Sequence, residues 1–209
     1  MTKLRGTLTH LFELVFRWIR VPVEPGLIEF GNPDENSPVF LTCNYDLTVR
    51  RVSKYLKNLD CYLLVAPTRG INVWCASCGG DFNAHSVISV IKITDISSKV
   101  KHRTIIAPQL SAPGIDVKKV KDETGWNIVF GPVYAKYIPE YVRNGFKKTE
   151  KMRKVKFTVR DRLEMASTYF FSLAVFLIPI LFALAFMLPN VVTGSTLSWI
   201  LQMVFLLGL

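Results

Sequence analysis

Short apolar runs alternate with amphipathic segments between residues 39 and 144, and this alternation predicts the elements of the chain's first part. Apolar runs followed by turns are typical of buried strands, and apolar residues three or four apart are typical of helices. The predicted strands are 39–42, 61–66, 71–74, 104–107 and 127–130, and the predicted helices are 47–59, 82–93, 117–123 and 135–144. Because strands and helices alternate, the pattern predicts an α/β fold of Rossmann-like type with a mostly parallel sheet.

Residues 3–20 form a separate amphipathic pattern at the start of the chain. Their apolar residues are spaced by three or four, and the pattern ends before Pro22. This spacing predicts a helix with one apolar face. The aromatic and basic side chains of the segment suit a membrane surface as well as packing on the domain, so the sequence leaves both alternatives open.

An apolar run at residues 168–188 predicts a transmembrane helix. The run is 21 residues long, so as a helix it would span roughly 30 Å, the thickness of a bilayer core. Pro179 lies within it, which membrane helices tolerate. Polar and turn-forming residues follow at 189–196, and a second apolar segment, 197–209, would reach only about 20 Å. We therefore expect one full membrane span and part of a second.

Charge divides the chain at the same place. The net charge is +10, from 26 basic and 16 acidic residues, and every charged residue precedes Met165. This segregation excludes a single ordinary globular domain and a disordered polycation. The segment 147–162 holds eight basic and two acidic residues beside the predicted span, an excess that marks the cytoplasmic side.

Two regions follow from these patterns. We expect a cytoplasmic α/β domain over residues 1–163 and a transmembrane region over 164–209, with the protein located in the cytoplasmic membrane. We do not expect nucleic acid as a partner, because a membrane flank and lipid headgroups account for the basic residues. The sequence also lacks the glycine-rich phosphate-binding motifs of nucleotide-binding proteins.

Four segments that follow predicted strands are rich in glycine and other small residues. They are 43–45, 74–80, 108–114 and 131–133. In a mostly parallel sheet, ligands bind at the carboxyl ends of the strands, where these segments meet. Small residues allow the backbone to approach a ligand closely. We therefore expect a pocket for a large, flat ligand at this edge.

Cys75 and Cys78 form a C-x-x-C motif within the second of these segments, and three interpretations compete. Trp74 before Cys75 gives the W-C-x-x-C form of a dithiol oxidoreductase. Together with Cys43 and Cys61 the pair makes four thiols, although their spacing matches no compact zinc or iron–sulfur motif. The third interpretation is a single axial ligand to a bound metal cofactor. The motif alone leaves all three open.

The wider sequence adds a resemblance. The run N-V-W-C-A at Asn72–Ala76 resembles the signature N-(V/I)-W-C-A-(A/G)-G-K of the membrane corrinoid protein of the mercury-methylation pair. The chain is also similar, more distantly, to the corrinoid-binding domain of the corrinoid iron–sulfur protein of the acetyl-CoA pathway. Further segments that carry the resemblance are 25–27, 37–45, 68–71, 108–110, 112–114, 131–133 and 152–153.

The resemblance implies a corrinoid-binding domain of Rossmann-like type, followed by transmembrane helices. Cys75, as a thiolate, would be the lower axial ligand of cobalt in a base-off, cobalamin-type corrinoid. Asn72 would orient the loop, and Trp74 would pack against the domain to hold Cys75. The implied cofactor-binding residues are Asn72, Val73, Trp74, Cys75, Ala76, Gly79, Gly80, Thr42, Asn44, Gln109, Leu110, Ala112, Gly114, Gly131, Pro132 and Val133.

The implied activity is that of a corrinoid-dependent methyltransferase, which would pass a methyl group from cobalt to Hg(II) and form methylmercury. Its implied partners are a ferredoxin-like iron–sulfur reductase and a methyl donor, either a protein or methyl-folate. This chain has Cys78-Gly79 where the signature has Gly-Lys. A related corrinoid methyl carrier of one-carbon metabolism with another acceptor, or a membrane-tethered dithiol oxidoreductase, therefore stays as an alternative.

Overall fold

The computed structural model describes residues 20–156 and 158–187. The chain divides into two compact units, one of residues 19–156 and one of residues 1–18 with 157–209. The amphipathic segment 3–20 and the second apolar segment 197–209, both predicted above, therefore lie almost wholly outside the described residues.

A five-stranded sheet is the centre of the first unit. Its strands are β1 (Gly26–Phe30), β2 (Val39–Cys43), β3 (Cys61–Ala66), β4 (Thr104–Ala107) and β5 (Asn127–Phe130). Their order in the sheet is β1-β3-β2-β4-β5, and all neighbours are parallel except β1, which pairs with β3 in the antiparallel sense. The sheet is therefore a parallel α/β sheet with one antiparallel edge strand.

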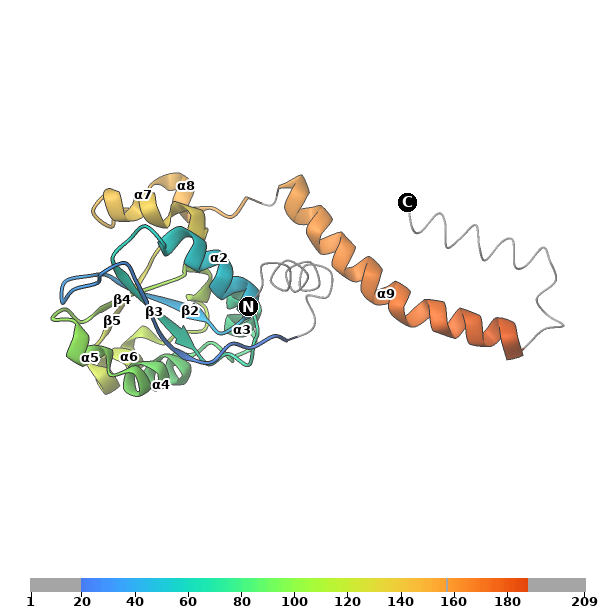
Figure 1. Cartoon of the computed structure of the whole chain (residues 1–209), viewed down its shortest axis with the longest axis horizontal. Helices are drawn as coiled ribbons and strands as arrows, with labels where there is room; N and C mark the ends of the chain where they lie inside the picture. The colour runs from blue at the N-terminus through green and yellow to red at the C-terminus, as the bar shows by residue number, and fades with distance from the viewer. Residues whose placement is uncertain (1–19, 157, 188–209) are drawn as a thin grey trace. The chain divides into compact units, whose positions relative to one another are not determined.

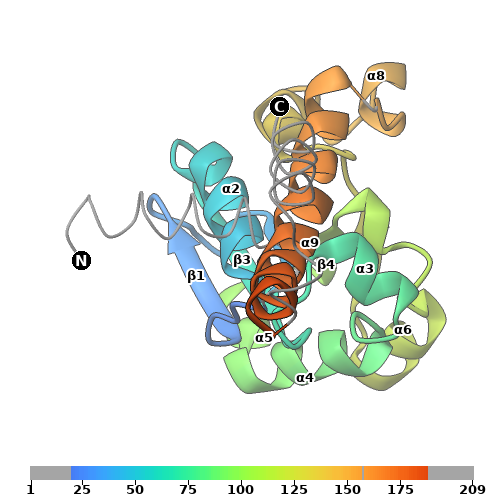
Figure 2. The same ribbon diagram turned by 90° about the vertical axis from the view of Figure 1, so that its right-hand side faces the viewer.

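Helices cover both faces of this sheet (Figure 1). One face carries α4 (Ala84–Thr94), α5 (Ile96–Lys99) and α6 (Val117–Thr124), and Figure 2 shows α4 and α6 side by side there. The other face carries α2 (Asp46–Leu56), α7 (Ile138–Arg143) and α8 (Glu150–Arg153). The remaining elements are α3 (Val73–Cys78), α9 (Val159–Met187) and the 3-10 turns η1 (Gln109–Ser111) and η2 (Ala135–Tyr137).

The two faces of the sheet bury two separate apolar cores. Along β2, Val39 and Leu41 point into the core beneath α4 and α6, whereas Phe40 between them points into the core beneath α2 and α7. This division follows from the period of two in a strand, which sends successive side chains to opposite faces. A strand covered on both faces reads as a continuous apolar run, and this is why β2 and β3 could be predicted from the sequence.

Local hydrogen bonds set where the helices begin and end. Helix α4 begins at a capping box, in which the side chains of Asn83 and Ser86 each bond the other's backbone N–H. Helix α6 begins where the Asp116 side chain accepts from Lys119 N, and it ends at Gly125 with φ +75°. A left-handed residue at this position is a common helix stop, and glycine adopts it without strain.

Most of the predicted elements of this unit are confirmed. Strands β3, β4 and β5 have the predicted bounds, β2 is one residue longer, and the predicted helices form at the predicted places with ends shifted by a few residues. The predicted strand at 71–74 is wrong, because helix α3 begins there. Strand β1 is not among the strands that the sequence pattern predicts. Its sequence, GLIEF, has no long apolar run. An edge strand is only partly buried and does not require one.

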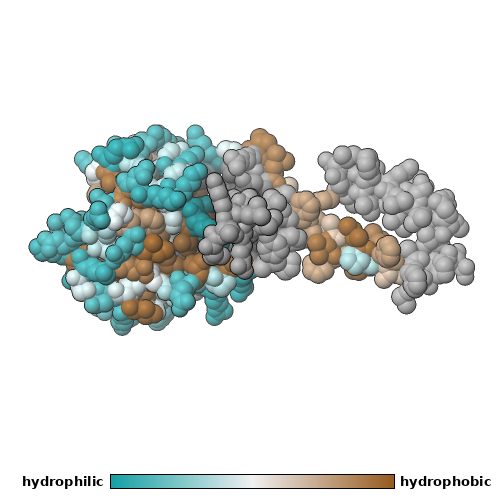
Figure 3. Space-filling view, viewed as in Figure 1, coloured by the Kyte–Doolittle hydropathy of each residue, from teal (hydrophilic) through white to brown (hydrophobic). Residues whose placement is uncertain are grey.

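Helix α9 contains residues 168–187 of the apolar run that predicted a membrane span. It is 29 residues long, and most of its described large apolar side chains are exposed (Figure 3). No helix in residues 20–156 and 158–187 is both long and apolar enough to cross a membrane. The predictions of transmembrane helices and of a location in the cytoplasmic membrane are therefore wrong for the part of the chain that the structure describes.

The physical reason for the correction lies in what a span requires. A transmembrane helix needs about 20 consecutive, predominantly apolar residues within one helix. The predicted span, 168–188, ends at Leu188, which lies outside the described residues. Helix α9 begins at Val159, and its first turn contains the charged residues Arg160, Asp161 and Arg162.

Candidate functional site

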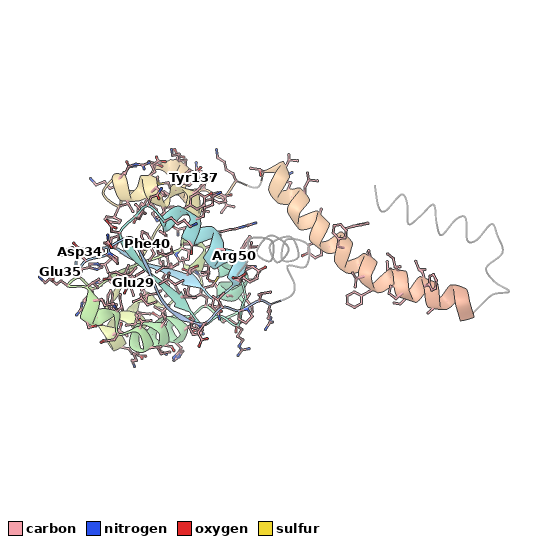
Figure 4. All side chains as sticks on the ribbon, in the orientation of Figure 1. Glu29, Asp34, Glu35, Phe40, Arg50 and Tyr137 are labelled. Atoms are coloured by element: carbon pink, nitrogen blue, oxygen red, sulfur yellow. The ribbon has the colours of Figure 1, made fainter. Side chains whose placement is uncertain are left out.

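The carboxyl ends of the four parallel strands lie at one edge of the sheet. The chain leaves β2 at Asn44, β3 at Pro67 and β4 at Pro108, and each exit leads into one of the glycine-rich segments. The turn before β2, with Asp34 and Glu35, lies at the opposite end of the sheet (Figure 4). The structure thus gathers the predicted segments at a single edge, as expected for a parallel sheet.

Asn44 fixes the turn that leads from β3 into α3. Its Oδ1 accepts from Thr68 N at 2.9 Å, from Thr68 Oγ1 at 3.0 Å and from Gly70 N at 2.9 Å. Its Nδ2 donates to Val23 O at 3.0 Å. The side chain is buried, and its hydrogen bonds join it to other residues of the protein. Asn44 therefore supports the site by holding residues 68–70 in place.

Two successive residues of this turn, Arg69 and Gly70, have positive φ angles, which suit glycine but not arginine. Gly70 has φ +69°, and a Cβ there would lie 2.8 Å from Pro22 N, so only glycine fits. Arg69 before it has φ +54°, which is unusual for a residue with a side chain. Arg69 Nε pairs with Asp81 Oδ1 at 3.2 Å. This ion pair joins the residues just before and just after α3.

Helix α3 carries both cysteines of the C-x-x-C motif. Asn72 caps the helix, because its Oδ1 accepts from Cys75 N at 3.0 Å. The Nδ2 of the same amide donates to Cys75 Sγ at 3.4 Å. Cys75 and Cys78 are exposed, whereas Ala76 and Ser77 between them are buried. The helix therefore presents its two thiols outward and packs its small residues against the domain.

A second loop, residues 108–115, lies directly against α3. A Cβ on Gly114 would stand 2.3 Å from Phe82 O and 2.9 Å from Ser77 Cα, so the two backbones are in contact. Ser111 Oγ donates to Pro108 O at 2.7 Å and holds the loop in a tight turn. Gly114 was predicted to face the cofactor, and in the structure its missing side chain allows this close packing.

Lys148 adds a positive charge to the same edge. Its Nζ donates to Gln109 Oε1 at 2.7 Å, which places it beside η1. Burial lowers the pKa of Lys148, and the nearby charge of Arg153 lowers it further. No pattern in the sequence indicates this placement, because Lys148 lies among the basic residues that flank the predicted span.

The segment after β5 is buried. Gly131 N donates to Ala107 O at 2.8 Å, and a Cβ on Gly131 would lie 2.8 Å from Ile106 Cγ2. Val133 N donates to Met152 O at 2.9 Å. Like Thr42 in β2, these residues support the edge and do not present side chains at its surface.

The predicted site residues thus fall into three groups. Those exposed on α3 and just after it can meet a ligand directly, and those on the 109–114 loop are partly buried beside them. Trp74 is 50% exposed, so half of its surface is covered by the domain, and its role in holding Cys75 stays a prediction. The exposed group is Asn72, Trp74, Cys75, Gly79 and Gly80; the partly buried group is Val73, Gln109, Leu110, Ala112 and Gly114; the buried group is Thr42, Asn44, Ala76, Gly131, Pro132 and Val133.

The other two cysteines are not placed to act as ligands. Cys43 and Cys61 lie in strands β2 and β3 and are fully buried. Burial raises the pKa of the Cys43 thiol and raises that of Cys61 to about 12. Within residues 20–156 and 158–187, no group of three or more His, Cys, Asp or Glu residues is placed to hold a metal ion. The geometry therefore does not favour a four-thiol zinc or iron–sulfur centre.

Sequence reasoning missed four residues that shape this edge. Thr68 and Arg69 form the turn before α3, Asp81 anchors its far end, and Lys148 reaches η1. Thr68 and Arg69 stand in a segment that carried the family resemblance, which could have pointed to them. Asp81 and Lys148 are 12 and 79 positions from Arg69 along the chain, and their contacts at this edge exist only in the folded protein.

Comparison with known proteins places this geometry in context. The model of a family described as CO dehydrogenase/acetyl-CoA synthase delta subunit matches residues 10–142. The acetyl-CoA decarbonylase/synthase complex subunit gamma of Methanopyrus kandleri is 42% identical over 123 residues, which are 57% of this chain and 26% of the relative. The corrinoid/iron-sulfur protein large subunit of Moorella thermoacetica is 35% identical over 127 residues, 60% of this chain and 28% of the relative.

These relatives bear on the resemblance predicted from the sequence. The chain spans about a quarter of the length of the curated relatives it matches. The predicted relation to corrinoid proteins is confirmed at this level. The names of these relatives do not mention mercury methylation, so that part of the resemblance stays a prediction.

Proposed function

We propose a function from one premise: the chain belongs to the CO dehydrogenase/acetyl-CoA synthase delta subunit family. The function supported best is binding of a corrinoid and carriage of a methyl group in one-carbon metabolism. One observation supports it above the others. Cys75 is exposed at the carboxyl edge of the sheet. The side-chain amide of Asn72 accepts a hydrogen bond from Cys75 N and donates one to Cys75 Sγ.

The residues present fit a corrinoid. A thiolate is a soft ligand that suits a transition metal such as cobalt. Next to Cys75, residues 79 and 80 have no side chains, and a Cβ on Gly80 would meet nothing within 4 Å. A broad, flat ligand could therefore approach the backbone after α3 without a steric clash.

Each group of site residues would have its own task in holding the corrinoid. Cys75 would be the axial ligand of cobalt, with the corrinoid's own lower base displaced. Asn72 keeps an N–H directed at the sulfur, so that the sulfur accepts a hydrogen bond and its position is fixed. The exposed and partly buried residues around α3 would contact the corrinoid, and the buried group would act by holding the loops. When bound, the corrinoid supplies methyl-transfer chemistry at its cobalt.

Reconstitution with cobalamin tests this function. The full chain, purified and reduced, is incubated with aquocobalamin, freed of unbound corrinoid and measured by visible absorbance. Wild type should retain about one corrinoid per chain and show a base-off spectrum with a changed axial ligand. Cys75→Ala should lose the thiolate features, and the matched control Cys78→Ala should keep them. Failure of wild type to retain corrinoid, or identical spectra for wild type and Cys75→Ala, would contradict the proposal.

A finer proposal concerns the activity and the acceptor of the methyl group. We propose that the chain acts as a corrinoid-dependent methyltransferase with Hg(II) as its acceptor, on the strength of the N-V-W-C-A run at Asn72–Ala76. Its partners would be a ferredoxin-like iron–sulfur reductase and a methyl donor, either a protein or methyl-folate. Methylcobalamin-loaded protein should form methylmercury from Hg(II) faster than free methylcobalamin does. Equal rates would refute Hg(II) as the acceptor and favour another acceptor of one-carbon metabolism.

A further inference from the structure

We propose that Cys75 and Cys78 together form a binding site for one soft d10 metal ion of the Cu(I) type, which prefers two thiolate ligands. Binding of this ion would exclude the bond between Cys75 and cobalt. The second statement rests on the proposed function, whereas the first stands on the geometry of α3 alone.

The two thiols lie on one face of a helix. Cys75 and Cys78 are three positions apart on α3, where neighbouring Cβ atoms are about 5–6 Å apart. Both side chains are exposed, and the residues between them, Ala76 and Ser77, point into the domain. Ser77 is held inward by a bond from its Oγ to Val73 O at 2.7 Å. The outward direction of both sulfurs is therefore built into the helix.

The surroundings of the pair suit a cation. Between Arg69 and Lys92 the chain has no lysine or arginine, and Arg69 is paired with the Asp81 carboxylate. Lys148, the positive charge at this edge, donates its Nζ to Gln109 Oε1 on η1. Gly79 and Gly80, which follow Cys78, carry no charge. The absence of a positive side chain next to the thiols along the chain lowers the cost of bringing a metal cation to this position.

The donor set selects the class of ion. Two thiolates with no third His, Cys, Asp or Glu placed beside them, within the described residues, cannot make the four-coordinate site that zinc prefers. Thiolate softness selects ions such as Cu(I), and two sulfurs satisfy such an ion. Cys43 and Cys61 are buried in the sheet and cannot contribute.

A shared ligand, Cys75, makes the two metals compete. Cys75 is the cobalt ligand of the proposed function and one of the two thiols of this site. A thiolate sulfur that already donates to Cu(I) is a much weaker donor to a second metal, so each metal lowers the affinity for the other. By linkage this effect is reciprocal.

Competition for Cu(I) tests the site itself. The reduced, corrinoid-free full chain is titrated, without oxygen, against a chromophoric Cu(I) chelator. Wild type should take up one Cu(I) per chain. Cys75→Ser and Cys78→Ser should each weaken binding by more than about 100-fold, beyond the 10–100-fold typical for loss of an outer partner. Cys61→Ala serves as the matched control and should bind like wild type.

The result that would overturn the site is equal Cu(I) affinity in wild type and Cys78→Ser. Both serine variants change exposed side chains, and far-ultraviolet circular dichroism checks that they are folded. An uptake of one ion that depends on Cys75 alone would also overturn the proposal, because it would show a single-thiol contact.

A second measurement tests the exclusion. Cu(I) added to corrinoid-loaded wild type should shift the visible spectrum to that of the corrinoid-loaded Cys75→Ala protein, and it should leave corrinoid-loaded Cys78→Ser unchanged. No shift in wild type would refute the exclusion. Failure of wild type to bind corrinoid at all would refute the proposed function, while the Cu(I) titration would still decide whether the two-thiol site exists.

Discussion

Asn72 joins the local structure of α3 to the chemistry of Cys75 through one amide group. Its oxygen accepts from Cys75 N, which fixes the amide orientation and directs its nitrogen to Cys75 Sγ. The sequence shows an asparagine before a short run that could be helical, which is a common helix start. It cannot show that the other end of the same amide reaches the sulfur. The cap is therefore predictable from the sequence and the contact with sulfur is not.

Substitutions of Asn72 should separate these two roles. Asn72→Ala removes both and should destabilise the protein by about 1 kcal/mol, the usual cost of a lost cap. Asn72→Asp keeps the acceptor for Cys75 N but has no N–H for the sulfur. Urea unfolding should therefore show a lower free energy of unfolding for Asn72→Ala and almost no change for Asn72→Asp. Both variants should alter the visible spectrum of the corrinoid-loaded protein. Equal stability of wild type and Asn72→Ala would contradict the cap.

Asn44→Ala should destabilise the protein more than any change at Asn72. It leaves the buried N–H groups of Thr68 and Gly70 without their acceptor, and each orphaned buried group costs about 1–3 kcal/mol. Urea unfolding measures this loss, and Asn58→Ala, at an exposed position after α2, is the control. A loss no larger than that of the control would show that the turn at 68–70 does not depend on Asn44.

At the scale of elements, α3 is a helix that could not stand alone. It has six residues, far fewer than the roughly 12–15 that an isolated helix needs in water. Its stability comes from the Asn72 cap, the buried Ala76 and Ser77, and the 108–115 loop packed against it. The sequence pattern at 71–74 predicted a strand because a short apolar run does not distinguish a strand from a helix.

Two glycines near α3 should respond differently to substitution. At Gly114 a Cβ would collide with Phe82 O, so Gly114→Ala should cost about 1–3 kcal/mol and Gly114→Asn more. At Gly80 space is open but φ is +81°. There alanine should cost about 1–2 kcal/mol and asparagine less, because asparagine tolerates left-handed backbone. Urea unfolding of the four variants measures both orders. The same order at both positions would contradict the distinction between packing and backbone strain.

At the scale of the whole molecule, the parallel sheet decides where chemistry can occur. It buries Cys43 and Cys61 in its strands and sends the chain out to Cys75 and Cys78 at its carboxyl edge. The same burial couples stability to pH. A thiol whose pKa is higher in the folded than in the unfolded protein favours folding only while it is protonated in both states. That stability is present below the unfolded pKa and is lost as pH rises.

Cys61 should therefore make the protein less stable in alkali. Its pKa rises from 9.0 to about 12 on folding, so the affected window runs between these values. Between about pH 8 and pH 10 the Cys61 contribution should fall by about 1.4 kcal/mol, the equivalent of one pH unit above the unfolded pKa. Urea unfolding at both pH values measures the loss in wild type, and Cys61→Ala should lose less by that amount. The same pH dependence in both proteins would contradict this assignment.

The sequence by itself determined the parallel strands β2 to β5, the helices between them and the position of the C-x-x-C motif between the strand 61–66 and the helix that follows it. These features depend on local apolar patterns, which are the same in any context that buries them. The tertiary structure decided the edge strand β1, the helix at α3, the hydrogen bonds of Asn44, and the packing role of Gly114. It also separated two exposed thiols from two buried ones and overturned the predicted membrane span. All of these depend on contacts between segments distant in the chain, or on the helix that a segment forms, which a one-dimensional pattern does not contain.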